Sequence, residues 1–294
     1  MGPMALAFKT LALIGRYKGR DVAAPLQRLG RFLVEQGCSV VVERETAADS
    51  GLDGFPVADF AALGAQANLA VVLGGDGSML SAARALAAFD VPLVGVNQGR
   101  LGFMTDIALG AMTEAMGAIL AGRYTLETRT MLAAEVCRAD RLVHATVGLN
   151  DVVISKGASG RLIELEVRID GRFVYDLRSD VLIVATPTGS TAYALSSNGP
   201  ILQPNVPAFA LVPTAPHTLS NRPIAISDSC AIEITVRHGA DAQLQCDGQP
   251  QLDLVEGDRV SARRGPHTVK LVHPPGYDYY AMLREKLHWS EHAL

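Results

Sequence analysis

The chain has 294 residues, 49% of them hydrophobic and 19% charged, which is the composition of a folded protein with a sizeable core and favours two domains. Its net charge of −4 argues against nucleic acid as the main partner. No apolar run reaches the ~20 residues that cross a membrane, and residues 1–9 lack the regions of a signal peptide. The scattered cysteines, with no metal-binding spacing, are typical of reduced thiols. We therefore expect a cytoplasmic protein that binds neither nucleic acid nor membranes.

The first 125 residues alternate between strand and helix patterns, and this order predicts an α/β domain with a parallel sheet flanked by helices. Residues 44–58 are rich in Gly, Asp and Pro, and we expect a mobile loop there. A glycine-rich turn is expected at 99–103. Strands are predicted at 11–15, 40–42, 69–73 and 91–97, and helices at 26–34, 79–86 and 112–119.

The most unusual stretch of this half is a glycine turn that directly follows the buried strand at 69–73. It consists of Gly74, Gly75, Asp76 and Gly77, and Ser78 is expected to cap the next helix. Open α/β sheets bind their ligands beyond the carboxyl ends of parallel strands. Glycine lets a phosphate approach the backbone N–H groups. The three glycines are therefore candidates to cradle phosphate.

After Tyr124 the apolar period changes from 3.6 to 2, which predicts an all-β domain at 126–274. Apolar residues alternate at 163–169, up to the Asp-Gly pair at 170–171 that is typical of a hairpin turn. They alternate again at 252–254, after a second Asp-Gly pair at 247–248. We expect many short strands and no long helix there. Residues 275–294 are expected to form a helical tail.

A polar run at 186–200 follows the buried strand at 181–185. Thr188, Gly189 and Ser190 are candidates to wrap phosphate through hydroxyl and backbone N–H groups, and Tyr193 offers a flat surface for a purine. A Ser/Thr-rich surface loop is the alternative. The chain lacks the P-loop, HExxH and dinucleotide-binding GxGxxG signatures, so the corresponding enzyme classes are excluded.

These motifs, taken in order, resemble the bacterial ATP-dependent NAD kinases. The resemblance rests on the glycine turn at 74–77, Asn150-Asp151, the polar run, Asp247-Gly248-Gln249, and the ending Leu271-Val272-His273-Pro274 with Tyr277, Tyr279, Leu283 and Trp289. It implies an α/β N-terminal domain, an all-β C-terminal domain, a C-terminal helix packing back on the first domain, and a homo-oligomer, either a dimer or a tetramer.

The resemblance also implies an activity: transfer of the γ-phosphoryl group of Mg-ATP to the adenosine 2′-hydroxyl of NAD, giving NADP. Asp76 is the candidate general base, because it is the carboxylate within the glycine turn. We expect magnesium to arrive with ATP, with no metal site built by the protein. The residues implied to bind NAD are Asp76, Gly77, Asn150, Asp151, Arg161, Arg178, Asp180, Thr191, Ala192, Tyr193, Ala194, Leu195, Ser196 and Gln249.

Three residues depart from the family pattern. Asp151 replaces a glutamate, Asn198 a glycine that a left-handed backbone would favour, and Val181 a glycine after the acid. Arg178 and Asp180 share a strand face, so we also expect Arg178 to orient Asp180 and to select the redox form of the dinucleotide.

Two other functions remain open. A lipid or sugar kinase of the same superfamily would share the glycine turn. A non-catalytic NAD-binding regulator would keep the pocket but lose the base.

Overall fold

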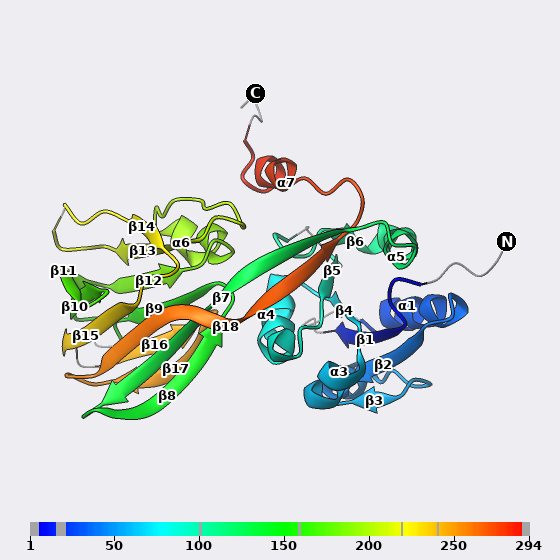
Figure 1. Ribbon diagram of the computed structural model, residues 1–294, viewed down its shortest axis with the longest axis horizontal. Coiled ribbons are helices and arrows are strands. Elements are labelled where there is room, and N and C mark those ends of the chain that lie inside the picture. Colours follow the sequence, from blue (N-terminus) through cyan, green and yellow to red (C-terminus); the bar gives the residue numbers. More distant parts are fainter. Residues whose placement is uncertain are drawn as a thin grey trace. The chain divides into compact units, whose positions relative to one another are not determined.

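The computed structural model describes residues 6–15, 22–99, 102–157, 160–218, 220–239 and 241–289. It divides into two compact units, Met1–Glu127 with Lys270–Leu294, and Thr128–Val269. Two long strands, β7 (Thr125–Arg138) and β18 (Arg259–His273), carry the chain from one unit into the other (Figure 1). No helix among the described residues is long and apolar enough to cross a membrane.

The first unit contains the predicted parallel sheet, in the order β5-β4-β1-β2-β3. Because β1 has β2 on one side and β4 on the other, the strand order reverses between β1 and β4, and such a switch point is where open α/β sheets bind ligands. The strands are β1 (Thr10–Gly15), β2 (Ser39–Glu43), β3 (Val57–Ala58), β4 (Leu69–Leu73) and β5 (Leu93–Asn97), with β6 (Ile107–Ala108) paired to β5.

Helices cover this sheet. α1 (Ala23–Glu35) and α5 (Met112–Leu120) pack against one face in a shared apolar core. α4 (Asp76–Leu86) contacts β4 and β5, and α3 (Phe60–Gln66) contacts α4. All residues of β4 and β5 are buried, as is usual for parallel strands covered on both faces. Short turns of 3₁₀ helix lie at Ala87–Phe89 and Leu109–Ala111, and α7 (Tyr279–Lys286) belongs to this unit.

The expectation of a mobile loop at 44–58 is wrong. These residues contain α2 (Arg44–Ser50) and β3. The carboxylate of Glu43, which is buried, accepts hydrogen bonds from the backbone N–H groups of Glu45 and Thr46 and from the Thr46 hydroxyl. This cap starts a helix that has no apolar periodicity of its own, so the sequence pattern missed it.

The second unit is all-β, as predicted, and consists of two sheets packed face to face. One has the order β14-β13-β12-β9-β16-β17, and the other contains β11-β10-β15-β18 together with β7 and β8. Their inner faces share one apolar core. The remaining strands are β8 (Arg141–Gly148), β9 (Asp151–Ser155), β10 (Ile163–Ile169), β11 (Arg172–Ser179), β12 (Val181–Ala185), β13 (Ala208–Thr214), β14 (Ile224–Ser227), β15 (Ile232–His238), β16 (Ala242–Cys246) and β17 (Gln249–Leu254).

The two predicted hairpins are confirmed. Asp170 and Gly171 have φ values of +49° and +74°, and Asp247 and Gly248 have +48° and +72°, as expected for turns with two left-handed residues. Many of the strands are short, as predicted, but β7 has 14 residues and β18 has 15. Both strands leave one unit and enter the other, so a single apolar period does not describe their full length.

Candidate functional site

The glycine turn lies at the carboxyl end of β4, beside the switch point of the sheet. The backbone N–H of Gly74 donates to Val96 O at 2.9 Å, which continues the pairing of β4 with β5. α4 then begins at Asp76, with Gly75 as the residue before it and no side-chain cap. The predicted cap by Ser78 is therefore wrong, since Ser78 lies within the first turn of α4 and not before it.

Two of these glycines are not required by the protein's own packing. A Cβ atom placed on Gly75 or Gly77 would meet no described atom within 4 Å, and neither residue has a positive φ. A side chain would fit both positions in the free protein. The open space at Gly75 and Gly77 thus leaves room for a bound molecule.

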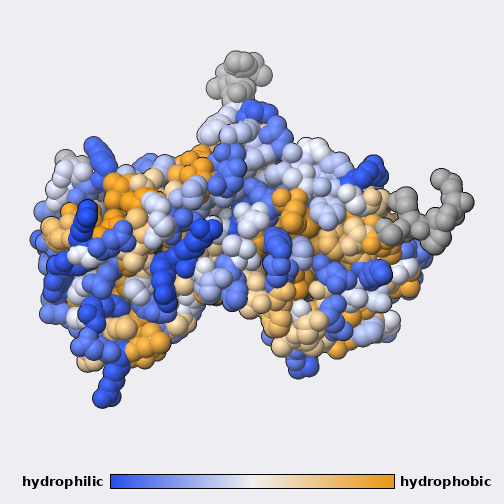
Figure 2. Space-filling model, viewed as in Figure 1, coloured by the Kyte–Doolittle hydropathy of each residue, from blue (hydrophilic) through white to orange (hydrophobic). Residues whose placement is uncertain are grey.

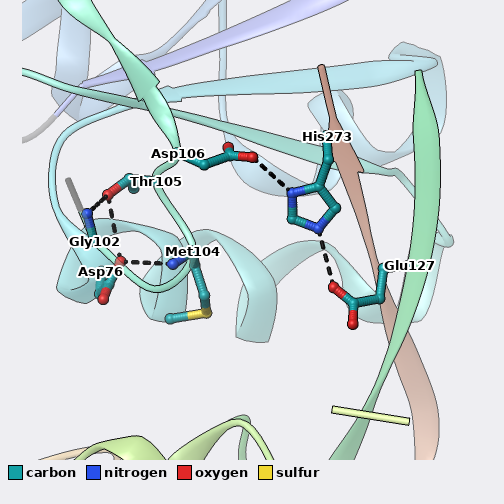
Figure 3. Close-up of polar contacts among 7 residues, drawn as sticks. All are labelled: Asp76, Gly102, Met104, Thr105, Asp106, Glu127 and His273. Carbon is teal, nitrogen blue, oxygen red and sulfur yellow. Dashed lines mark hydrogen bonds and ion pairs between the residues drawn. The ribbon is translucent and has the colours of Figure 1, made fainter. Parts of the chain in front are cut away.

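The carboxylate of Asp76 is held by the segment that follows β5 (Figure 3). It accepts hydrogen bonds from the N–H of Phe103 at 2.8 Å, the N–H of Met104 at 3.0 Å and the hydroxyl of Thr105 at 3.4 Å. Gly102 is needed for this close approach, because a Cβ there would lie 2.1 Å from Asp76 Oδ1. The described donors use two lone-pair positions on Oδ1 and one on Oδ2, which leaves Oδ2 able to accept one more proton donor.

Sequence reasoning predicted a turn at 99–103 but did not connect it with Asp76. The signal was available: β5 neighbours β4 in a parallel sheet, so the turns that follow both strands meet at one edge. Asn97 strengthens the contact, since its side-chain amide donates to the Thr105 hydroxyl at 2.9 Å. Arg100 and Leu101 of the predicted turn lie outside the described residues.

In the second unit, Asp247 organises the start of β9. Its carboxylate accepts from the backbone N–H groups of Leu149 at 3.1 Å, Asn150 at 2.8 Å and Asp151 at 3.3 Å. Gly148 fits beside it because a Cβ there would lie 2.9 Å from Asp247 Oδ1. Sequence analysis placed Asp247 in a turn and in a family motif but did not connect it with Asn150 and Asp151, whose backbone it fixes.

Asp151 is the most perturbed acid of this unit. It is only 4% exposed, and burial, followed by the charge of Asp247, raises the pKa of its carboxyl to about 7. Near neutral pH the side chain is therefore divided between its neutral and charged forms. Perturbed acids of this kind are candidates for functional residues.

The polar run at 186–200 covers the outer face of β12, and most of its hydroxyl groups bond to the chain itself. Thr186 donates to Leu149 O at 2.5 Å, and Ser190 donates to Pro187 O at 2.6 Å and accepts from the N–H of Leu202 at 2.9 Å. Ser190 is fully buried and its hydroxyl bonds to the chain itself, which counts against a hydroxyl contact with phosphate at this position. A local pattern shows hydroxyl groups but not their partners.

Two further candidates in this run are also enclosed. The Thr188 hydroxyl accepts from Arg129 Nη1 at 3.2 Å, and both residues are buried. Gly189 is a packing requirement, because a Cβ there would lie 2.0 Å from Asn150 O. The run therefore joins the end of β12 to the start of β9 and fixes their relative position.

The exposed part of the run is a short helix, α6 (Tyr193–Ser196). Tyr193 is 42% exposed, so it is not a core residue, whereas Ala194 is fully buried and contributes to the core through its side chain. Thr191, Ala192 and Leu195 are partly exposed, and Ser196 is exposed. Asn198 follows with φ +61°, the left-handed conformation expected of it.

The predicted contact between Arg178 and Asp180 is replaced by two other ion pairs. Arg178 Nε lies 3.0 Å from Glu164 Oε1, and Lys156 Nζ lies 2.6 Å from Asp180 Oδ1. The register of β10 and β11 places Glu164 directly opposite Arg178, which decides this pairing. The expectation that Arg178 orients Asp180 is therefore wrong. Val181 is the first residue of β12, where a β-branched side chain is well suited.

Arg161 and Gln249 are both exposed. The candidate site residues thus form two groups, one around Asp76 in the first unit and one around β9, β12 and α6 in the second. Among the described residues, no three His, Cys, Asp or Glu side chains gather as a metal centre.

A switch point with a carboxylate held in an open glycine turn is the arrangement of a nucleotide-binding α/β protein. The comparisons with known proteins agree and are more specific. Residues 11–124 match the family model of the ATP-NAD kinase N-terminal domain, and residues 149–274 match that of the ATP-NAD kinase C-terminal domain. The chain belongs to the family of ATP-dependent NAD kinases, which confirms the resemblance found in the sequence.

Bacterial relatives match over nearly the whole chain. The NAD kinase of Aromatoleum aromaticum is 54% identical over 288 residues, which cover 98% of this chain and 96% of the relative. That of Nitrosospira multiformis is 50% identical over 287 residues, covering 98% of each.

Solved structures have the same fold. The yeast NADH kinase complexed with NADH aligns with a TM-score of 0.87 and 24% identity over 96% of this chain and 88% of its own. The NAD kinase from Archaeoglobus fulgidus in complex with ATP aligns with a TM-score of 0.72 and 22% identity over 95% and 98%.

Proposed function

We propose that the protein transfers the γ-phosphoryl group of Mg-ATP to the 2′-hydroxyl of the adenosine ribose of NAD, giving NADP and ADP. The observation that carries this proposal is the carboxylate of Asp76, held by Phe103, Met104 and Thr105 beside the open positions of Gly75 and Gly77. Membership of the NAD kinase family supplies the substrates.

Asp76 acts as the general base in this proposal. The ribose hydroxyl donates its hydrogen to Asp76 Oδ2, its oxygen attacks the γ-phosphorus, and the bond from that phosphorus to the bridging oxygen of ADP breaks. The proton remains on the carboxylate until it is released to water. Little more than positioning and charge stabilisation is needed for phosphoryl transfer. Magnesium enters as part of the substrate Mg-ATP, held mainly by its phosphates.

The second group of residues is proposed to bind NAD. Asn150 and Asp151 contact ribose hydroxyls, and residues 191–196 line the adenine pocket. Gly77 is proposed separately as a backbone contact of the ribose. Support comes from Asp247, which fixes the backbone of 149–151, and from the exposure of Tyr193. Arg161, Arg178, Asp180 and Gln249, all with exposed or partly exposed side chains, are proposed to surround the rest of the dinucleotide.

One assay separates this function from the other two candidates. The protein is incubated with Mg-ATP and NAD, and NADP is measured, with parallel reactions that contain a diacylglycerol or a hexose in place of NAD. We expect NADP only when ATP and NAD are both present. Phosphorylation of the lipid or sugar alone would identify the superfamily alternative, and NAD binding without product would identify a regulator.

Replacing Tyr193 by alanine is expected to weaken NAD binding about tenfold, because an exposed aromatic ring loses its apolar contact with the adenine. Calorimetric titration with NAD measures the change. Tyr280→Ala serves as the control, since Tyr280 is a similarly exposed tyrosine on α7. An unaltered Kd in the Tyr193 variant would show that the ring does not contact the dinucleotide.

We also propose a homo-oligomer formed through the β unit. Several large apolar side chains are exposed there, among them Leu142 and Val143 on β8 and Phe173 and Val174 on β11, and Figure 2 shows apolar surface in several places on this unit. Light scattering at micromolar concentration should give a mass of two or four chains. A monomeric mass would contradict the proposed oligomer. An oligomer that stays intact when Phe173→Ser and Leu142→Ser are combined in one chain would contradict the proposed surface.

A further inference from the structure

His273, the last residue of β18, is enclosed between two carboxylates of the first unit (Figure 3). Its Nδ1 lies 2.9 Å from Asp106 Oδ2 and its Nε2 lies 3.1 Å from Glu127 Oε2. The ring of Tyr277 stacks on the imidazole at a centroid distance of 3.7 Å. His273 is only 1% exposed, so the cluster joins three separate stretches of the chain in a buried environment.

Two charged carboxylates, one at each ring nitrogen, favour a doubly protonated imidazole. A neutral histidine has one ring N–H, whereas donation to both Asp106 and Glu127 needs two. Burial by itself lowers the pKa of His273, but the hydrogen bonds and charges of Asp106 and Glu127 outweigh it and raise the pKa above the usual value. Among the described residues, the aromatic ring of Tyr277 also contacts the imidazole. In the positively charged state both ring nitrogens have an acceptor.

Further charges lie near Asp106. Glu114 of α5 and Arg123 line a cavity of about 460 Å³ together with Asp106, Pro274 and Pro275. Asp106 Oδ1 is buried and has no hydrogen-bond partner among the described residues. The ion pair with His273, at 2.9 Å on the other carboxylate oxygen, is thus a direct compensation of the Asp106 charge.

Asp106 also ends the segment that holds Asp76. The residue before it, Thr105, donates its hydroxyl to Asp76, and Phe103 and Met104 donate their N–H groups. Residues 102–106 are thus attached to Asp76 at one side and to His273 at the other.

We propose that His273 is a positioning residue for Asp76: as the imidazolium ion, it holds Asp106 and thereby keeps residues 102–106 in place against the Asp76 carboxylate. An effect of His273 on turnover rests on the proposed role of Asp76 as the general base. The structural coupling of His273 to Asp76 through residues 102–106 does not rest on that role.

The coupling makes the segment sensitive to pH. The pKa of His273 is higher in the folded protein than in the unfolded chain, so its stabilising effect is complete below the unfolded value, about 6.5. The effect is lost as the pH rises through the folded value. The neutral ring then keeps only one of its two hydrogen bonds, and the segment loosens.

Hydrogen exchange tests the coupling without any assay of activity. In His273→Gln the amides of Phe103 and Met104 should exchange about tenfold faster than in the native protein, as expected when a hydrogen bond to a charged group is lost. His238→Gln is the matched control, because His238 also pairs with a glutamate but lies exposed in the second unit. Unchanged protection of Phe103 and Met104 in His273→Gln would overturn the proposal, whether or not the protein forms NADP.

A second variant keeps the test valid if His273→Gln fails to fold. Asp106→Asn retains an acceptor oxygen but removes the charge, so the pKa of His273 should fall. If loosening of residues 102–106 lowers kcat as the pH rises, the alkaline limb of the kcat profile should move down by about one pH unit in this variant. The KM for NAD should change little, because Asp106 is not among the residues proposed to bind the dinucleotide. A limb that stays in place in Asp106→Asn would contradict the proposal.

Discussion

Asp76→Asn is expected to lower turnover by about two to four orders of magnitude, the contribution typical of a positioned general base. The amide cannot take the proton of the ribose hydroxyl. Its oxygen can still accept one backbone hydrogen bond, but its NH₂ group must face a second donor, since the N–H groups of Phe103 and Met104 point at different carboxylate oxygens. Turnover is measured with saturating Mg-ATP and NAD, and NAD binding by calorimetry should be largely kept.

A control variant distinguishes two causes of reduced turnover, the loss of the general base and the loosening of residues 102–105. Thr105→Val removes the hydroxyl contact with Asp76 and disturbs residues 102–105 but leaves the carboxylate intact. Its turnover should fall much less than that of Asp76→Asn. Turnover of Asp76→Asn within tenfold of the native protein, or an equal loss in Thr105→Val, would argue against proton transfer to Asp76.

Asp151→Asn is expected to stabilise the protein, and to do so more at pH 8 than at pH 5. The pKa of Asp151 is about 7 in the folded protein, against 3.8 for an aspartate free in water. The destabilisation caused by charging this buried group therefore begins above pH 3.8 and is complete above about pH 7. About two of the roughly three units of this shift take effect between pH 5 and pH 8, so at ~1.4 kcal/mol per pKa unit the free energy of unfolding should gain about 3 kcal/mol more at pH 8 than at pH 5. The neutral amide avoids this cost at every pH.

Thermal unfolding at the two pH values measures the effect. Asp241→Asn is a suitable control, because Asp241 is exposed and has φ +68°, a conformation that asparagine adopts readily. It should change the Tm equally at both pH values. If Asp151→Asn behaves in the same way, the raised pKa and the role of burial in it are refuted.

The sequence by itself determined the elements that rest on short-range patterns. Continuous apolar runs predicted β4 and β12, because a strand buried on both faces needs apolar residues at every position. Alternation ending in an Asp-Gly pair predicted the β10–β11 hairpin, because that turn needs two left-handed residues. The motifs, read in order, predicted the family. Each of these signals is contained in neighbouring residues.

The tertiary structure alone decided the partners of the polar groups. Asp76 meets Phe103 and Met104, and Asp106 meets His273, although 167 positions separate the last two in the chain. Such pairs depend on which strands are neighbours and on their register, which no local period encodes. The same reason explains why Arg178 pairs with Glu164 rather than with Asp180: Glu164 lies directly opposite Arg178 on the neighbouring strand, whereas Asp180 follows the end of β11.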